Sequence, residues 1–156
     1  MFFLSWNIPT ERKGERFFRI THDYPIALAK ALLNANPAVT FCFLSGQGAD
    51  PSEKSRVAFA KAKGAAENSL NKLDLKQFYI FRPGYIHPDR PRPDRPVGEK
   101  ISGFLYPALR FILPRFVIQA KELAKGMINV GLSGYKERLL HNLMIKDAAK
   151  NDSMID

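Results

Sequence analysis

The feature that most limits the fold of this chain is a short apolar run, VTFCFL, from Val39 to Leu44. It is β-branched and aromatic and does not alternate with polar residues, which is typical of a strand covered on both faces in a parallel sheet. Small and polar residues from Ser45 to Gly48 follow at once. The pattern therefore predicts a buried strand with a loop at its carboxyl end.

Helical and strand patterns alternate around this run. Tyr24 to Leu33 reads as a helix with its proline in the first turn, and helical spacing returns from about Ser52 to Leu73. The apolar Met1 to Leu4 reads as a first strand, before the run at Val39, and Gln77 to Phe81 (QFYIF) reads as a third. The order strand, helix, strand, helix, strand predicts an α/β fold with a parallel sheet.

The segment after the strand at Gln77 to Phe81 is rich in proline, with five prolines from Pro83 to Pro96. Proline blocks both helix and central strand, so residues 87–98 are predicted to form an extended loop. Its basic residues alternate with acidic ones, which favours a solvated, semi-rigid lid over a nucleic-acid track.

The most apolar stretch, Ile101 to Ile118, is interrupted by Arg110 and Arg115 and broken by Pro107 and Pro114. Its apolar residues repeat at helical spacing, which predicts a bent amphipathic helix rather than a bilayer span.

Two further elements are expected beyond that helix. A second helix is predicted near Gln119 to Leu132, and a short strand or helical turn within Arg138 to Ile145.

Length and composition fit one domain over residues 1–156. Within it we expect sheet and helices in 1–86, the loop in 87–98 and a helical region in 99–156. A single cysteine excludes an intrachain disulfide, and no secretory leader is evident, so a cytoplasmic location is expected. The net charge of +9 favours phosphate-bearing partners in general.

Open parallel sheets bind ligands at the carboxyl ends of their strands. Ser45 and Gly46 follow one predicted strand, and Arg82-Pro83-Gly84 follows the next. On the helix between them, Phe59 and Lys63 are one turn apart and share a face. Ordinary roles remain open, because Ser45 also suits a turn and Lys63 an exposed helix face.

The remaining reactive side chains form no recognisable site. His22, His87 and His141 lack the spacing of metal ligands and suit surface or turn positions. Cys42 lies inside a predicted strand with no basic neighbour to lower its pKa, so we expect a small buried hydrophobe.

Three segments together resemble the short-chain dehydrogenase/reductase superfamily, over about Phe17 to Leu132. They are RITHDYPIALAKALLNANPAVTFCFLSGQGAD, SEKSRVAFAKAKGAAENSL and FYIFRPGYIHP. The likeness is to its atypical NAD(P)-binding members, NmrA-like or nucleoside-sugar-epimerase-like. It implies a partial Rossmann-like, doubly wound parallel sheet flanked by helices and lacking the first βαβ units.

The resemblance also implies a cofactor, NAD or NADP, and roles for particular residues. Ser45 would be the substrate-side hydroxyl and Lys63 would bind the nicotinamide ribose, both as catalytic residues. The implied cofactor pocket is lined by Leu44, Ser45, Lys63, Arg82, Pro83, Gly84, Tyr85 and Ile86.

Two departures from the superfamily weaken the implied activity. No glycine-rich G-x-x-G-x-x-G turn opens the chain, and Phe59 stands at the position of the catalytic tyrosine, where a phenyl ring has no proton to exchange. The implied function is an NAD(P)-binding oxidoreductase or epimerase-like protein with impaired cofactor binding. The alternative is a non-catalytic oligomeric remnant or interaction module of the same fold.

Partner expectations follow from the same pattern. In the strand order that the resemblance implies, Met1 to Leu4 would leave an exposed strand edge, covered by a second copy of the chain, by strand exchange or by a refolded amino-terminal segment. A homo-oligomer is therefore expected. Neither nucleic acid nor a membrane span is expected; binding to DNA or to a membrane surface would rest on the net charge alone.

Overall fold

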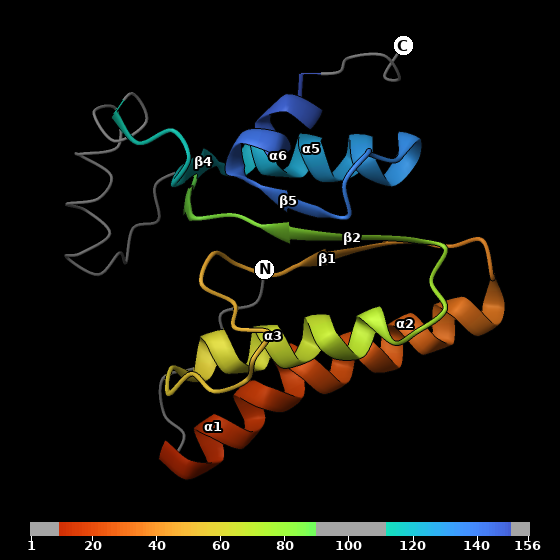
Figure 1. Cartoon of the computed structure of the whole chain (residues 1–156), viewed down its shortest axis with the longest axis vertical. Helices are drawn as coiled ribbons and strands as arrows, with labels where there is room; N and C mark the ends of the chain where they lie inside the picture. The colour runs from red at the N-terminus through yellow and green to blue at the C-terminus, as the bar shows by residue number, and fades with distance from the viewer. Residues whose placement is uncertain (1–9, 90–111, 151–156) are drawn as a thin grey trace. The chain divides into compact units, whose positions relative to one another are not determined.

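The computed structural model describes residues 10–89 and 112–150 of the chain (Figure 1). Its elements in chain order are α1 (Thr10–Phe18), the π-helical segment η1 (Arg19–Asp23), α2 (Tyr24–Ala35), β1 (Thr40–Leu44), α3 (Ala58–Asn71), β2 (Gln77–Arg82), β3 (Tyr85–His87), β4 (Val117–Gln119), α5 (Ala120–Ser133), β5 (Leu139–His141) and α6 (Asn142–Ala148).

The structure is mixed α/β with small parallel sheets. One sheet has the strand order β1-β2-β5, and both of its pairs are parallel. Phe41 lies opposite Phe78, and Ile80 lies opposite Leu139. A second sheet pairs β3 with β4, also in parallel. The predicted α/β fold class is confirmed, and this sheet is consistent with a partial Rossmann-like fold.

The chain divides into two compact units that interleave in sequence. A helical unit comprises Met1–Pro37 and Gly48–Leu75, and a sheet unit comprises Ala38–Gln47 and Lys76–Asp156. The expectation of one domain over the whole chain, with its three parts, stays a prediction.

The core of the sheet unit lies where α5 and α6 contact the strands. Phe81, Ile118 and Leu140 in it are fully buried. Gly126 permits close packing there, because a Cβ at that position would lie 2.7 Å from the carbonyl oxygen of Ile145 on α6. The buried core consists of Tyr79, Phe81, Ile118, Leu123, Val130, Leu140, Ile145 and Ala148.

The helical unit is built from α1, η1, α2 and α3, which contact one another. A loop at Asp50 closes against α3 at Gly64, where a Cβ would lie 1.8 Å from the Asp50 carbonyl oxygen. The Asp50 side chain accepts hydrogen bonds from the Ser52 hydroxyl (2.6 Å) and from the Ser55 backbone N–H (2.7 Å). These bonds fix the loop that precedes α3.

Several sequence predictions of secondary structure are confirmed. The strands expected at 39–44 and 77–81 are β1 and β2, and the helices expected at 24–33 and 119–132 are α2 and α5. The tail region 138–145 contains both alternatives, a strand (β5) followed by the start of α6.

Other boundaries were wrong. The helix expected from Ser52 begins only at Ala58, because the Asp50 side chain holds the preceding residues in a turn. The last residues of the predicted apolar helix, Val117 and Ile118, belong to β4 and pair with β3. The loop expected over 87–98 begins too early, because His87 pairs with Gln119 as the last residue of β3. The rest of that loop from residue 90, the first part of the apolar helix and the strand expected at 1–4 lie outside the described residues.

Across residues 10–89 and 112–150, no helix has both the length and the apolarity needed to cross a bilayer.

Candidate functional site

The carboxyl edge of the β1-β2-β5 sheet gathers polar groups from three separate segments. Ser45 follows β1, Pro83 and Gly84 follow β2, and Asn142 follows β5. Because the three strands are parallel, these residues meet at one edge of the sheet.

Hydrogen bonds tie these segments together. The Ser45 N–H donates to the carbonyl of Phe81, and the Gln47 N–H donates to that of Pro83, both at 2.8 Å. The Gly84 N–H donates to the Asn142 side-chain oxygen at 3.0 Å. The edge is therefore a fixed polar surface held by backbone geometry.

Glycine is required at position 84 by a close backbone approach. A Cβ there would lie 2.2 Å from the Phe116 carbonyl oxygen and 2.6 Å from the Gln47 side-chain oxygen. The neighbouring Tyr85 N–H donates to the same Phe116 carbonyl at 2.8 Å. The Arg-Pro-Gly turn thus has a structural reason that involves no cofactor.

Asn142 is the polar residue of this edge with an unmet hydrogen-bonding group. Only 1% of its surface is exposed. Its Oδ1 accepts the Gly84 N–H, while its Nδ2 is buried with no hydrogen-bond partner. Leaving a buried donor unpaired costs about 1–3 kcal/mol, so this amide is suited to a ligand or water that accepts a hydrogen bond.

The structure places the predicted site residues in two groups. Ser45 and Pro83 are buried, and the other predicted residues of the sheet unit are half-buried. Those at or beside the carboxyl edge are Leu44, Ser45, Arg82, Pro83, Gly84, Tyr85 and Ile86. Lys63 instead lies on α3, in the helical unit.

Lys63 is half-buried on α3. Burial lowers the pKa of its ammonium group, and the nearby Glu67 carboxylate acts in the opposite direction and raises that pKa. Glu67 lies one turn further along α3 and is only 3% exposed. The two side chains therefore form a partly desolvated acid–base pair on one helix face.

Phe59, which the resemblance sets at the position of a catalytic tyrosine, lies on the same helix. Phe59 is 40% exposed near the start of α3 and offers no ionisable group. The roles predicted for Ser45 and Lys63 stay predictions.

The other reactive residues are distributed over both units. Cys42 lies in β1, and burial raises the pKa of its thiol, the reverse of activation. His87 lies in β3 and His141 ends β5, whereas His22 lies within the η1 segment rather than in a turn. In the described parts of the chain, no group of three or more His, Cys, Asp or Glu side chains is placed to hold a metal ion.

Comparison with known proteins gives relatives of one name. The chain is 29% identical over 122 residues to "Protein FMP52, mitochondrial" of Coccidioides immitis, covering 75% of this chain and 48% of that protein. It is 27% identical over 119 residues to "Protein fmp-52, mitochondrial" of Neurospora crassa, covering 71% and 47%. The chain thus spans about half the length of the curated relatives it matches. No protein-family model matches it.

These relatives correct the resemblance drawn from the sequence. They are named FMP52 proteins, so the prediction of a short-chain dehydrogenase/reductase, NmrA-like or epimerase-like chain is wrong. The predicted function, an NAD(P)-binding oxidoreductase or epimerase-like protein, is therefore wrong too. The alternative of a remnant of that superfamily is wrong for the same reason. The Arg82-Pro83-Gly84 turn was misleading because close backbone packing alone explains its glycine.

The cytoplasmic location is contradicted by the same relatives, which are named mitochondrial. The single cysteine and the lack of an evident secretory leader were the basis of that expectation. Cysteine usage separates oxidising from reducing compartments, and it does not distinguish one reducing compartment from another.

Sequence reasoning missed Asn142, although a signal was present. It directly follows the short apolar segment Leu139 to His141, in the region where a strand was one of two alternatives. Had that strand been chosen, its carboxyl end would have pointed to Asn142.

Proposed function

We propose that the sheet unit binds a small phosphate-bearing ligand at the carboxyl edge of β1-β2-β5. The observation that supports this proposal is the buried, unpaired Nδ2 of Asn142, which faces no acceptor in the described structure. Such an amide donates to acceptor oxygens, and carbonyl and phosphate oxygens are both suitable. The chain's net charge of +9 favours an anionic ligand.

The neighbouring groups suit the same ligand. Ser45 places a buried hydroxyl beside β2, and the Gly84 turn brings backbone close to Asn142. NAD and NADP, predicted above, are the first ligands to test. The proposal concerns binding alone and includes no oxidoreductase or epimerase reaction.

The test is titration of the full chain, labelled with ¹⁵N, with NADH and with NADPH. Binding should move the side-chain amide signals of Asn142 and saturate with nucleotide. Asn142→Asp keeps an acceptor for the Gly84 N–H and removes the amide donor, so we expect it to weaken binding at least about tenfold. Asn129→Asp, on α5, is the matched control and should bind as the wild type does.

Two results would overturn the proposal. One is the absence of any Asn142 shift up to millimolar concentrations of both nucleotides. The other is binding that Asn142→Asp leaves unchanged while the variant remains folded.

We infer that the protein functions in mitochondria, as the names of its relatives suggest. A fluorescent fusion of the chain should co-localise with a mitochondrial marker. Diffuse fluorescence through the cytosol would contradict this inference.

Self-association through Met1 to Leu4, which the sequence predicts to be an edge strand, is also proposed. Light scattering on the purified chain should give a mass of at least two copies. Replacing Phe2 and Phe3 with Lys should reduce it to one, because like charges on an edge strand oppose pairing.

A further inference from the structure

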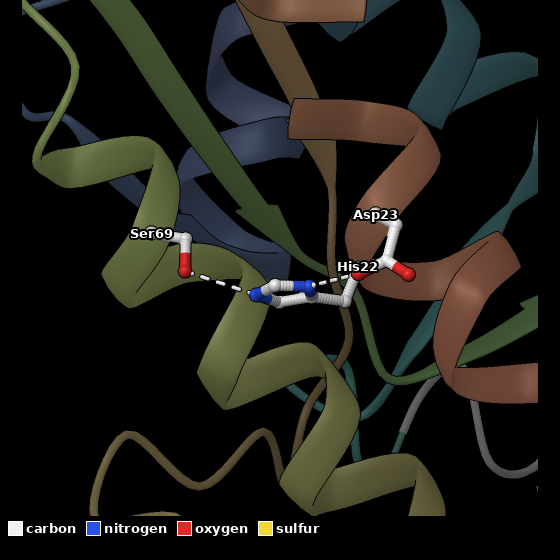
Figure 2. Close-up of polar contacts among 3 residues, drawn as sticks. All are labelled: His22, Asp23 and Ser69. Atoms are coloured by element: carbon white, nitrogen blue, oxygen red, sulfur yellow. Dashed lines mark hydrogen bonds and ion pairs between the residues drawn. The ribbon is translucent and has the colours of Figure 1, made fainter. Parts of the chain in front are cut away.

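The helical unit contains a second polar cluster, made of His22, Asp23 and Ser69 (Figure 2). The His22 Nδ1 is 2.7 Å from the Asp23 carboxylate, and the His22 Nε2 is 2.9 Å from the Ser69 hydroxyl. The histidine and aspartate come from η1, and the serine from α3, 47 residues from His22. The three side chains form a chain of hydrogen bonds with histidine in the middle.

The surroundings of His22 fix the plane of its ring. The Phe18 ring stacks on the imidazole, with ring centroids 4.7 Å apart and planes 24° from parallel. A π-helical turn, a feature frequent at functional sites, supplies both His22 and Asp23. The imidazole is therefore oriented by a stacked ring and by polar contacts on both of its nitrogens.

This arrangement assigns the proton positions. A carboxylate accepts hydrogen bonds only, so the proton of a neutral imidazole lies on Nδ1, facing Asp23. The Nε2 lone pair then accepts the Ser69 O–H. The His22 side chain is 19% exposed and that of Asp23 51%, so the cluster is accessible from solvent.

We propose that Ser69 is a nucleophile that takes an acyl group from carboxylic esters, with His22 as its general base. A nucleophile bonded to a base that is itself oriented by a third group is the diagnostic geometry of this chemistry. Asp23 acts through His22 and is a positioning residue.

The step balances without any co-reactant. The Ser69 oxygen attacks the ester carbonyl while its proton passes to His22 Nε2. The C–O bond to the alcohol then breaks, and the same proton leaves with the alcohol. Water, deprotonated by His22, later cleaves the acyl–serine ester and releases the acid.

Attack by Ser69 places a negative charge on the carbonyl oxygen of the ester, and the rate of acyl transfer depends on how well this oxyanion is stabilised. Ser69 lies inside α3, whose backbone N–H groups serve the helix ladder, so a side chain must supply the positive charge. Lys72 follows Ser69 by three residues and begins on the same side of the helix. A single flexible cation gives weak stabilisation, so both acylation and deacylation are expected to be slow, and acylation of Ser69 should be detected with activated reagents.

The test treats the full chain with a fluorophosphonate probe and with p-nitrophenyl acetate, followed by mass mapping of the adducts. Ser69 should be labelled, and Ser69→Ala should lose the adduct and the release of p-nitrophenol. His22→Gln retains a hydrogen-bonding side chain but is no base, so labelling should slow at least about a hundredfold. Asp23→Asn should slow the labelling of Ser69 about tenfold or more. Lys72→Met should slow only the cleavage of p-nitrophenyl acetate, by about tenfold.

Ser52 is the internal control, because its hydroxyl bonds directly to the Asp50 carboxylate at 2.6 Å without an imidazole. Thermal unfolding of each variant separates chemistry from folding. Labelling of Ser69 that His22→Gln leaves unchanged would overturn the proposal. Labelling of Ser69 no faster than that of Ser52 would also overturn it. A third such result is a set of variants that lower the unfolding temperature without affecting labelling, since the cluster would then serve only to stabilise the fold.

Discussion

The two polar sites of this molecule differ in how their hydrogen bonds are satisfied. At the sheet edge, Asn142 is fully buried and its Nδ2 has no partner. In the helical unit, both ring nitrogens of His22 are paired, and the cluster is open to solvent. A buried group left unpaired suits a site completed by a ligand, whereas a paired and exposed cluster is already assembled for chemistry.

The comparison shows that a site need not have every hydrogen bond made within the protein to be suited to a function. At the sheet edge, backbone hydrogen bonds connect the loops. The cluster at His22 depends on helix packing between η1 and α3. Perturbing each unit separately should therefore affect one site and spare the other.

The largest effect is expected from Gly64→Ala in the helical unit. The new Cβ would lie 1.8 Å from the Asp50 carbonyl oxygen. Because that oxygen belongs to the backbone, the clash can be relieved only if the loop moves. We expect the free energy of unfolding to fall by about 3 kcal/mol or more, with loss of Ser69 labelling. Urea denaturation measures this change in the free energy of unfolding. Gly14→Ala is the control, because nothing lies within 4 Å of its added Cβ and alanine favours a helix by up to about 1 kcal/mol. Equal stability of the two variants would contradict the close packing at Gly64.

The next largest effect is expected from Asn142→Ala in the sheet unit. It removes the acceptor of the Gly84 N–H and leaves a small cavity, so the free energy of unfolding should fall by about 2 kcal/mol. Ser69 labelling should not change while the protein is folded. Asn129→Ala, which loses a 2.9 Å bond to the Ala148 carbonyl from a half-buried position, should cost about 1 kcal/mol. A reversed order would mean that the unpaired amide of Asn142 outweighs its bond to Gly84.

A smaller effect is expected from Glu122→Ala at the start of α5. The Glu122 carboxylate accepts the Gln119 N–H at 3.0 Å and completes a capping box. Its loss should lower stability by about 1 kcal/mol, measured by thermal unfolding, and leave Ser69 labelling unchanged. Lys121→Ala, at an exposed neighbour, serves as the control and should change stability by less than about 0.5 kcal/mol. A change in Ser69 labelling would show that the two units are coupled.

The smallest effect is expected in the pH dependence of stability of the helical unit. Hydrogen bonds from the Ser52 hydroxyl, and then from the Ser55 N–H, lower the pKa of Asp50. A lowered pKa in the folded state stabilises the fold above the unfolded value of about 3.9, and this contribution is lost as the pH falls through the folded value. Asp50→Asn should therefore unfold with a weaker pH dependence between about pH 5 and pH 2 than the wild type. Identical acid profiles would contradict a role for this carboxylate.

Local patterns predicted the fold where a single segment decided its own structure. The continuous apolar runs of β1 and β2 and the helical spacing of α2 and α5 needed no knowledge of distant residues. In contrast, β4 has only three residues and exists because Val117 to Gln119 pair with β3, more than thirty positions earlier. Its apolar spacing alone favoured a helix.

The sites were predictable to the same extent. Ser45 and the turn after Phe81 lie at the strand ends where the parallel pattern placed them. The partnership of His22 with Ser69 was not predictable, because no spacing rule connects a histidine in a π-helical turn with a serine 47 residues later. The function implied by short motifs was wrong because turn geometry and ligand chemistry select the same glycine and proline residues.

The π-helical segment has a consequence for sequence comparison. It makes room for one more residue than an α-helical turn would hold, so deleting one residue within Arg19–Asp23 would restore a continuous α-helix from α1 to α2. The preceding helix would then rotate by about 100° about its axis. A homologue shorter by one residue here would align only with a gap at this point, and it would present a different face of its first helix while keeping the second in register.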